Sequence, residues 1–185
     1  LEYPAPNSAS VGAHVHQLLE AAGIVLKDDA QRDFDHGVFI PLKVAFPDAD
    51  IPVVQLSLKS GFDPAEHLAL GAALAPLRDE GVLIIGSGMS YHNLQKLIAS
   101  MRGRSVPNMS GPFDAYLAKA VQSPEAVRTQ LLQNWKAGEG ALEAHPEDEH
   151  LLPLMVAAGA ALSDQGHHDF TDHVMGAQIS AYRFG

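Results

Sequence analysis

The stretch VLIIGSGMSYHNL, at residues 82–94, joins a short apolar run to the start of a helix through a Gly-Ser-Gly turn. The run Val82 to Ile85 predicts a buried β-strand, and a helix is expected to begin around Tyr91 to Leu94. Ligands of α/β folds bind at the carboxyl ends of strands, where small residues allow close approach to the backbone. His92 is therefore a candidate site residue, although a structural histidine in a tight turn is an equally good interpretation.

Two better-known glycine motifs do not fit this turn. Gly86-Ser87-Gly88 lacks the third glycine and the Lys-Ser/Thr ending of phosphate-binding loops. The Gly-x-Ser-x-Gly pattern of serine nucleophiles is absent as well.

Helix and strand patterns alternate along the rest of the chain. This alternation predicts the α/β class, as a single domain with a central mostly parallel or mixed sheet flanked by helices. Further strands are predicted at residues 24–26, 52–58 and, at a sheet edge, 174–183. Helices are predicted from a Ser8 or Ser10 cap to Gly23, over 38–46 with Pro41 near the first turn, from Asp63-Pro64 to Arg78, over 113–121, from Ser123-Pro124 through Trp135, and over 150–161 with Pro153 in the first turn.

Composition excludes several classes of protein. Hydrophobic residues make up 46% and charged residues 18% of the 185 residues, which is typical of a globular chain. The apolar runs are too short to span a bilayer. The net charge is −10 and the 12 basic residues do not cluster, so we expect neither nucleic acid nor membrane as a partner. Without cysteine, any metal must bind His, Asp or Glu, and a cytoplasmic location is expected.

Two further histidines stand in settings that suit chemistry. His150 follows a charged group and directly precedes an apolar helix, so it and Glu149 are plausible ligands, whereas their acidic neighbours suit a helix start. His36 lies between Asp35 and Gly37 in a predicted loop. Imidazole titrates near neutral pH, so His36 suits acid/base work, with Asp35 as a residue that could orient it. An ordinary loop histidine is as good an interpretation of His36.

The other histidines are expected to matter less. His67 is interpreted as structural or exposed, while His145 and His173 are low-ranked neighbours of the site. The histidines expected to decorate the surface are His14 and His16 in the first helix and His167 and His168 in a polar loop.

Taken in order, seven stretches resemble the LigB-type (class III) extradiol dioxygenases, in the branch that includes DOPA 4,5-dioxygenase. The resemblance covers nearly the whole chain, and the combination is specific whereas no single stretch is. The matching stretches are Tyr3 to Pro6, Phe34 to Gly37, Phe46 to Pro52, Val54 to Ser57, Leu77 to Val82, Gly86 to Gly88 leading to His92-Asn93-Leu94, and Glu149 to Leu154.

The resemblance implies a catechol-type substrate, O2 and a mononuclear non-haem metal, with Fe(II) expected and Zn(II) as its alternative. It implies that His92 and His150 bind the metal and that His36 is the acid/base residue. Ser87, Asn93 and Asp35 would lie around the metal and substrate. The family's His-Gly-x-Pro and Ser-x-His-Trp motifs do not occur in this sequence. Residues 1–185 are therefore expected to form the larger, C-terminal part of the catalytic domain, with an incomplete or empty metal site.

Two other functions stay open at this point. One is a non-catalytic binding protein on the same scaffold, as in the Memo-like proteins, and the other is a zinc-dependent hydrolase. Arg102 and Arg104 suit a substrate carboxylate, but a solvated loop is the favoured interpretation. Assembly into a homo-oligomer is also left open.

Overall fold

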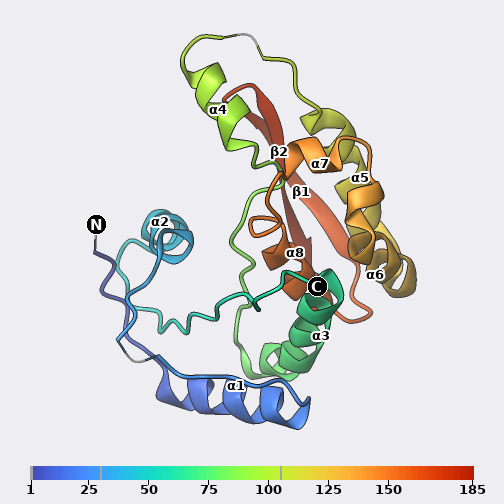
Figure 1. Cartoon of the computed structure of the whole chain (residues 1–185). Helices are drawn as coiled ribbons and strands as arrows, with labels where there is room; N and C mark the ends of the chain where they lie inside the picture. The colour runs from blue at the N-terminus through green and yellow to red at the C-terminus, as the bar shows by residue number, and fades with distance from the viewer. Residues whose placement is uncertain (1, 30, 105) are drawn as a thin grey trace.

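The computed structural model describes residues 2–29, 31–104 and 106–185. Figure 1 shows α1 and α2 on one side of the molecule, with α8 and a β-hairpin in the other part. The elements are α1 (Ala9–Ala21), α2 (His36–Ala45), α3 (Pro64–Leu74), the 3-10 helix η1 (Ala75–Glu80), α4 (Leu94–Met101), α5 (Ser110–Gln122), α6 (Glu125–Gln133), η2 (Trp135–Ala137), α7 (Ala141–Ala144), α8 (Leu152–Ala160), β1 (Gly166–Val174) and β2 (Ala177–Phe184).

Local capping explains several helix starts. Ser8 accepts a hydrogen bond from the Val11 N–H at the start of α1. Asp63 accepts from two N–H groups at the start of α3, with Pro64 as its first residue. Both predicted starts are confirmed. Such caps satisfy N–H groups that have no partner within the helix, so they can be recognised from local sequence.

The helix α2 begins two residues earlier than predicted, at His36, which places Pro41 inside the helix rather than near its first turn. Proline has no N–H, so it cannot donate to the carbonyl four residues before it, which is that of Gly37. That carbonyl accepts a hydrogen bond from the Ser87 hydroxyl instead. The proline therefore leaves an acceptor free for a tie to the Gly-Ser-Gly turn.

The strands that pair are β1 and β2, which form an antiparallel hairpin. Met175 and Gly176 connect them, both with positive φ, as in a two-residue turn of type I′. The predicted final strand is confirmed as β2, and the single mixed domain of helices and strands is confirmed. His167 and His168 lie in β1, so their placement in a loop was wrong.

The three other predicted strands lie outside the helices but have no ladder in the part of the chain that the structure describes. Their residues are 24–26, 52–58 and 82–85. In the run 82–85 the side chains alternate between two environments. Val82 and Ile84 pack against the helices, whereas Leu83 is 72% exposed. One face of the run is thus covered, but a strand also needs a neighbouring backbone to pair with.

Helix α8 lies in very close contact with its neighbours. A Cβ atom on Gly71 of α3 would overlap the Val156 carbonyl of α8, and one on Gly159 of α8 would overlap the Leu68 carbonyl of α3. Glycine at both positions lets the two backbones touch. The result is one of the most extensive element contacts of the fold, and α3 and α8 lie next to each other in Figure 1.

Two hydrophobic clusters surround this helix pair. Phe113, Leu117, Trp135 and Met155 belong to the larger cluster and are fully buried. The smaller cluster joins α1 to α3 and η1, with Leu19 at its centre. Among the described residues, the helices are all too short or too polar to cross a bilayer.

We expect Gly71→Ala and Gly159→Ala each to lower the free energy of unfolding by about 1–3 kcal/mol, because the added methyl group forces two packed backbones apart. Gly12→Ala in α1 is the matched control, since no atom lies within 4 Å of its Cβ position. That variant should be unchanged or gain up to about 1 kcal/mol. Urea unfolding measures all three, and equal effects at all three positions would contradict this packing.

Candidate functional site

Three histidines from distant parts of the chain meet near the start of α8. The ring centroids of His92 and His150 lie 3.5 Å apart, with their planes at 31°. The ring of His36 lies 6.5 Å from that of His150. The three predicted site histidines are therefore brought together, each at or just before the first residue of a helix.

The Gly-Ser-Gly turn holds His150 through its backbone. The Met89 N–H donates to the His150 carbonyl over 3.0 Å, and a Cβ atom on Gly88 would overlap that same carbonyl. A Cβ atom on Gly86 would overlap the Pro153 carbonyl in the same way. The sequence suggested that these glycines make room for a ligand. In the structure they make room for the start of α8.

Ser87 and Asn93 have structural bonding partners. The hydroxyl of Ser87 donates to the Gly37 carbonyl and so ties the turn to the residue that follows His36. The side-chain amide of Asn93 donates to the Glu143 carbonyl over 2.8 Å, while its oxygen caps α4. Asn93 directly follows His92 and Ser87 bonds the residue after His36, so both side chains hold backbone near the three histidines.

Asp35 does not contact His36 in the way that the sequence suggested. Its carboxylate lies 3.7 Å from the guanidinium of Arg32, and its N–H donates to the side chain of Gln55. Within the described residues, no hydrogen bond or ion pair joins the Asp35 carboxylate to the His36 ring. The orienting role of Asp35 therefore has no support in this geometry.

Burial keeps the paired histidines uncharged. Desolvation lowers the pKa of His92, and the neighbouring His150 lowers it further. Desolvation also lowers the pKa of His150, against an opposing effect of Glu149, whose carboxylate lies 3.6 Å from its Nε2. A neutral imidazole has a free nitrogen lone pair, which is the form that binds metals.

The donor chemistry of this pair fits a transition metal, but the number of donors is small. Imidazole suits iron and zinc alike. Among the described residues, no group of three or more His, Asp or Glu has metal-binding geometry. His92 and His150 therefore fit as part of a donor set rather than as a whole one.

A groove of about 700 Å³ leads to His150. The extended segment 82–90 forms one wall, β2 forms another, and α8 lies between them. Arg102 and Arg104 are exposed and do not line this groove. A small molecule at this end of the groove would contact His150, whereas His92 and His36 do not line the groove.

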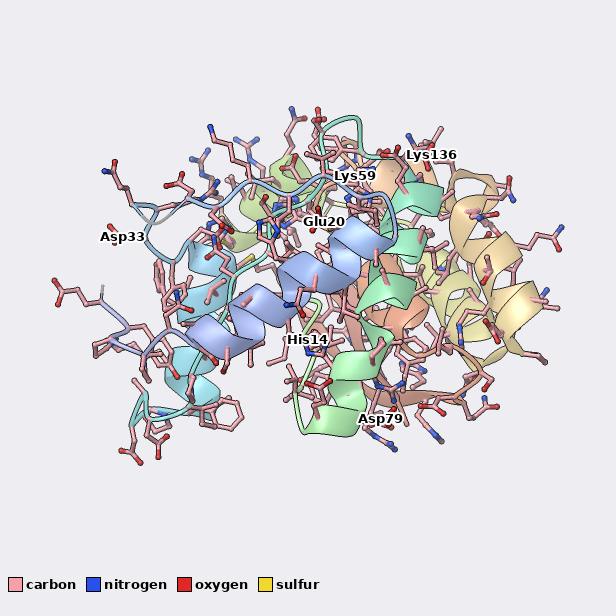
Figure 2. The ribbon with its side chains drawn as sticks, turned by 90° about the horizontal axis from the view of Figure 1, so that it is seen from below. His14, Glu20, Asp33, Lys59, Asp79 and Lys136 are labelled. Carbon is pink, nitrogen blue, oxygen red and sulfur yellow. The ribbon has the colours of Figure 1, made fainter. Side chains whose placement is uncertain are left out.

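The remaining histidines are mostly structural or on the surface. His14, labelled on α1 in Figure 2, lies 3.0 Å from Glu80, and His16 lies 3.5 Å from Asp28. His67 is fully buried, with its Nδ1 bonded to the Asp63 carbonyl and its Nε2 accepting from an N–H. The structural interpretation of His67 is confirmed.

Residues 143–145 are the part of the site that sequence reasoning missed. The Ala144 carbonyl accepts the His92 N–H over 2.9 Å, and the buried ring of His145 lies 3.1 Å, Nε2 to oxygen, from the Ser90 carbonyl. His145 was ranked low, and Glu143 was not considered. No local signal marks either residue, because their partners lie about 50 residues earlier in the chain.

The chain matches a known protein family over almost its whole length. Residues 1–184 match the family model described as the catalytic LigB subunit of aromatic ring-opening dioxygenase. The chain belongs to the LigB family. The resemblance found from the sequence motifs is thereby confirmed.

Relatives of this LigB chain agree with that assignment. A 4,5-DOPA dioxygenase extradiol from Portulaca grandiflora is 42% identical over 86% of this chain and 58% of its own length. The dioxygenase tasH from Hapsidospora irregularis is 34% identical over 100% of this chain and 60% of its own length. The LigB chain thus spans about 60% of the curated relatives that it matches.

A solved structure has the same fold. The crystal structure of an uncharacterized protein from Escherichia coli K12 superposes with a TM-score of 0.84 at 33% identity. The match covers 98% of the LigB chain and 74% of that protein. The LigB chain therefore shares its overall fold with that protein.

Acidification is expected to destabilise the LigB chain through His145. Burial lowers the pKa of His145 from 6.5 to about 4. Below pH 6.5 the unfolded chain therefore binds a proton that the folded chain excludes. The contribution of the neutral His145 ring to the free energy of unfolding is complete above pH 6.5. It falls by about 3 kcal/mol as the pH drops towards 4.

Urea unfolding between pH 7 and pH 4 tests this dependence. His145→Gln has no titrating ring at this position, so its stability should fall less over the same interval. His14→Gln is the control, because His14 is a partly exposed surface residue of α1. Parallel pH profiles for the wild type and His145→Gln would contradict the expectation.

Proposed function

We propose that this LigB protein is an extradiol dioxygenase, which opens the ring of a catechol-type substrate with O2 at a non-haem metal. Residues 1–185 would form part of its catalytic domain. The observation that carries the proposal is the close pair of His92 and His150, with the ring of a third histidine, His36, 6.5 Å from that of His150. Relatives named as extradiol dioxygenases support it.

His92 and His150 are proposed as metal ligands, with Fe(II) as the expected metal and Zn(II) as its alternative. Their lowered pKa values favour the neutral rings that coordination requires. When bound, the metal would bring the two catechol oxygens and O2 together at open coordination positions. Two imidazoles are fewer ligands than such a metal takes, so further donors would complete its coordination.

His36 is proposed as the acid/base residue. It is the first residue of α2, and the bond from Ser87 to Gly37 fastens that helix end to the site. His36 would take a proton from a catechol hydroxyl and return one as the ring opens. The ring would open beside the two hydroxyl groups, and both atoms of O2 would enter the product.

Oxygen uptake tests the activity. Protein loaded with Fe(II) under anaerobic conditions is mixed with a panel of catechols, and O2 consumption is followed together with the yellow ring-opened product. Absence of both with every catechol would sink the proposal. Hydrolysis of an ester or amide without O2 would favour a zinc hydrolase instead.

We expect His36→Ala to lower turnover by about 100- to 10,000-fold, which is the usual contribution of acid/base catalysis, while the bound metal stays unchanged. The matched control is His14→Ala, which removes a surface histidine. Turnover and metal content are measured on the same samples. Full turnover in His36→Ala would remove this residue from the mechanism.

Loss of either ligand should weaken metal binding. We expect His92→Ala and His150→Ala to retain less metal than the wild type after dialysis, as measured by elemental analysis. His173→Ala is the control, because His173 is an exposed residue of β1. Adding Fe(II) or Zn(II) back to chelator-treated wild type then identifies the metal that restores O2 uptake. Equal metal content in all variants would contradict the ligand assignment.

A further inference from the structure

The backbone on both sides of His92 is held by three consecutive residues, Glu143 to His145. The Glu143 carbonyl accepts from the Asn93 amide over 2.8 Å. The Ala144 carbonyl accepts from the His92 N–H over 2.9 Å, and the His145 ring bonds the Ser90 carbonyl. In Figure 1, α4 and α7, which flank these contacts, lie at the same end of the molecule.

The ring of His145 lies in an apolar setting that gives it a single polar contact. Its side chain is 1% exposed, and the rings of Phe113 and Trp135 lie 5.6 and 5.9 Å away, centroid to centroid. A carbonyl can only accept, so Nε2 carries the proton and donates to Ser90. The other nitrogen, Nδ1, has no partner among the described residues.

Burying the His145 ring with an Nδ1 that is unpaired within the described residues costs folding free energy. A buried polar atom without a partner costs about 1–3 kcal/mol, whereas a hydrocarbon side chain of similar size would fill the same space without that cost. What the imidazole of His145 adds is therefore the bond to Ser90. Since Ser90 is two residues from His92, the bond acts on the segment that carries the proposed ligand.

Ser90 and Tyr91 are held from other directions too. The Ser90 hydroxyl accepts from the Ser180 N–H of β2 over 2.8 Å. The Tyr91 hydroxyl donates to a carboxylate oxygen of Glu143 over 2.8 Å, and burial raises the pKa of this phenol, which stays protonated. The backbone of residues 90–93 thus has few conformations available, and the His92 ring is aimed at His150.

Glu143 also connects residues 90–93 to other parts of the chain. Its carboxylate also accepts from the Met109 N–H over 3.0 Å and pairs with Lys96 of α4 over 2.5 Å. Four groups, three from residues 91–96 and one from Met109, therefore bond to the carboxylate or the carbonyl of Glu143. Glu143 is a residue of α7, so these bonds hold that helix in place, and His145 is the residue that follows its end.

We propose that His145, supported by Glu143, is a positioning residue that sets the orientation of His92 for metal binding. The inference rests on the metal role proposed above for His92. Hydrogen-bonding partners behind metal ligands typically change metal affinity by about 10- to 100-fold when they are removed. His145 acts through the backbone of Ser90 rather than by touching the metal.

Two substitutions at position 145 test the proposal. His145→Leu fills the space without a donor, whereas His145→Gln places an N–H close to where Nε2 lies. The dissociation constant for Zn²⁺ is measured by competition with a chromophoric chelator. We expect a loss of about 10- to 100-fold in His145→Leu and a change of at most about threefold in His145→Gln. Near-UV circular dichroism shows whether each variant is folded.

The results separate the two proposals. Absence of Zn²⁺ binding by the wild-type protein would overturn the metal role of His92 and this inference with it. Wild-type affinity in a folded His145→Leu, or a loss in His145→Gln as large as in His145→Leu, would overturn only the positioning role.

A measurement on the wild type covers the case in which His145→Leu does not fold. Histidine-selective ¹⁵N NMR should show His145 as the neutral tautomer with a proton on Nε2 that exchanges slowly with water. Its Nε2–H signal should move when Zn²⁺ is added. A proton on Nδ1, or a signal that does not respond to bound Zn²⁺, would overturn the proposal.

Discussion

The contact of the α8 backbone with its neighbours on two sides is the constraint on which the rest of this structure depends. On one side, Gly71 and Gly159 let α3 and α8 touch. On the other side, Gly86 and Gly88 let the turn after segment 82–85 lie against the carbonyls at the start of α8. Because no side chain separates these backbones, small changes in any of them would move the others. His150 stands at this junction, so its position is set by main-chain packing.

The candidate site follows from that junction. His92 comes from the chain that continues beyond the Gly-Ser-Gly turn, and His36 is joined to the same turn by the bond from Ser87 to Gly37. Three segments that are far apart in sequence are thus fastened to one another by backbone groups. Burial then keeps His92 and His150 neutral, which is the condition for metal coordination. Packing and chemistry are linked, since the contacts that exclude water are those that shift the pKa values.

In the segment 82–85, one face is covered by helices while the other face is exposed. Residues 82–85 alternate between side chains that pack on the helices and side chains that face outward. The groove beside them runs between this segment and β2. Helix packing therefore decides which side chains of residues 82–85 are covered, while the described residues provide no ladder partner for this run.

The sequence alone determined the features that arise from neighbouring residues. Asp63 with Pro64 marked the start of α3, the final strand was recognised from its alternation, and the ordered motifs identified the family together with His36, His92 and His150 as candidates. These features depend on caps, periodicity and short motifs, which act within a few residues. Tertiary structure decided the rest. The contact of Gly88 with His150 and the bonds from Glu143 to Tyr91 and from His145 to Ser90 each join residues more than 50 positions apart. Such contacts depend on how whole helices pack, and no local pattern encodes that.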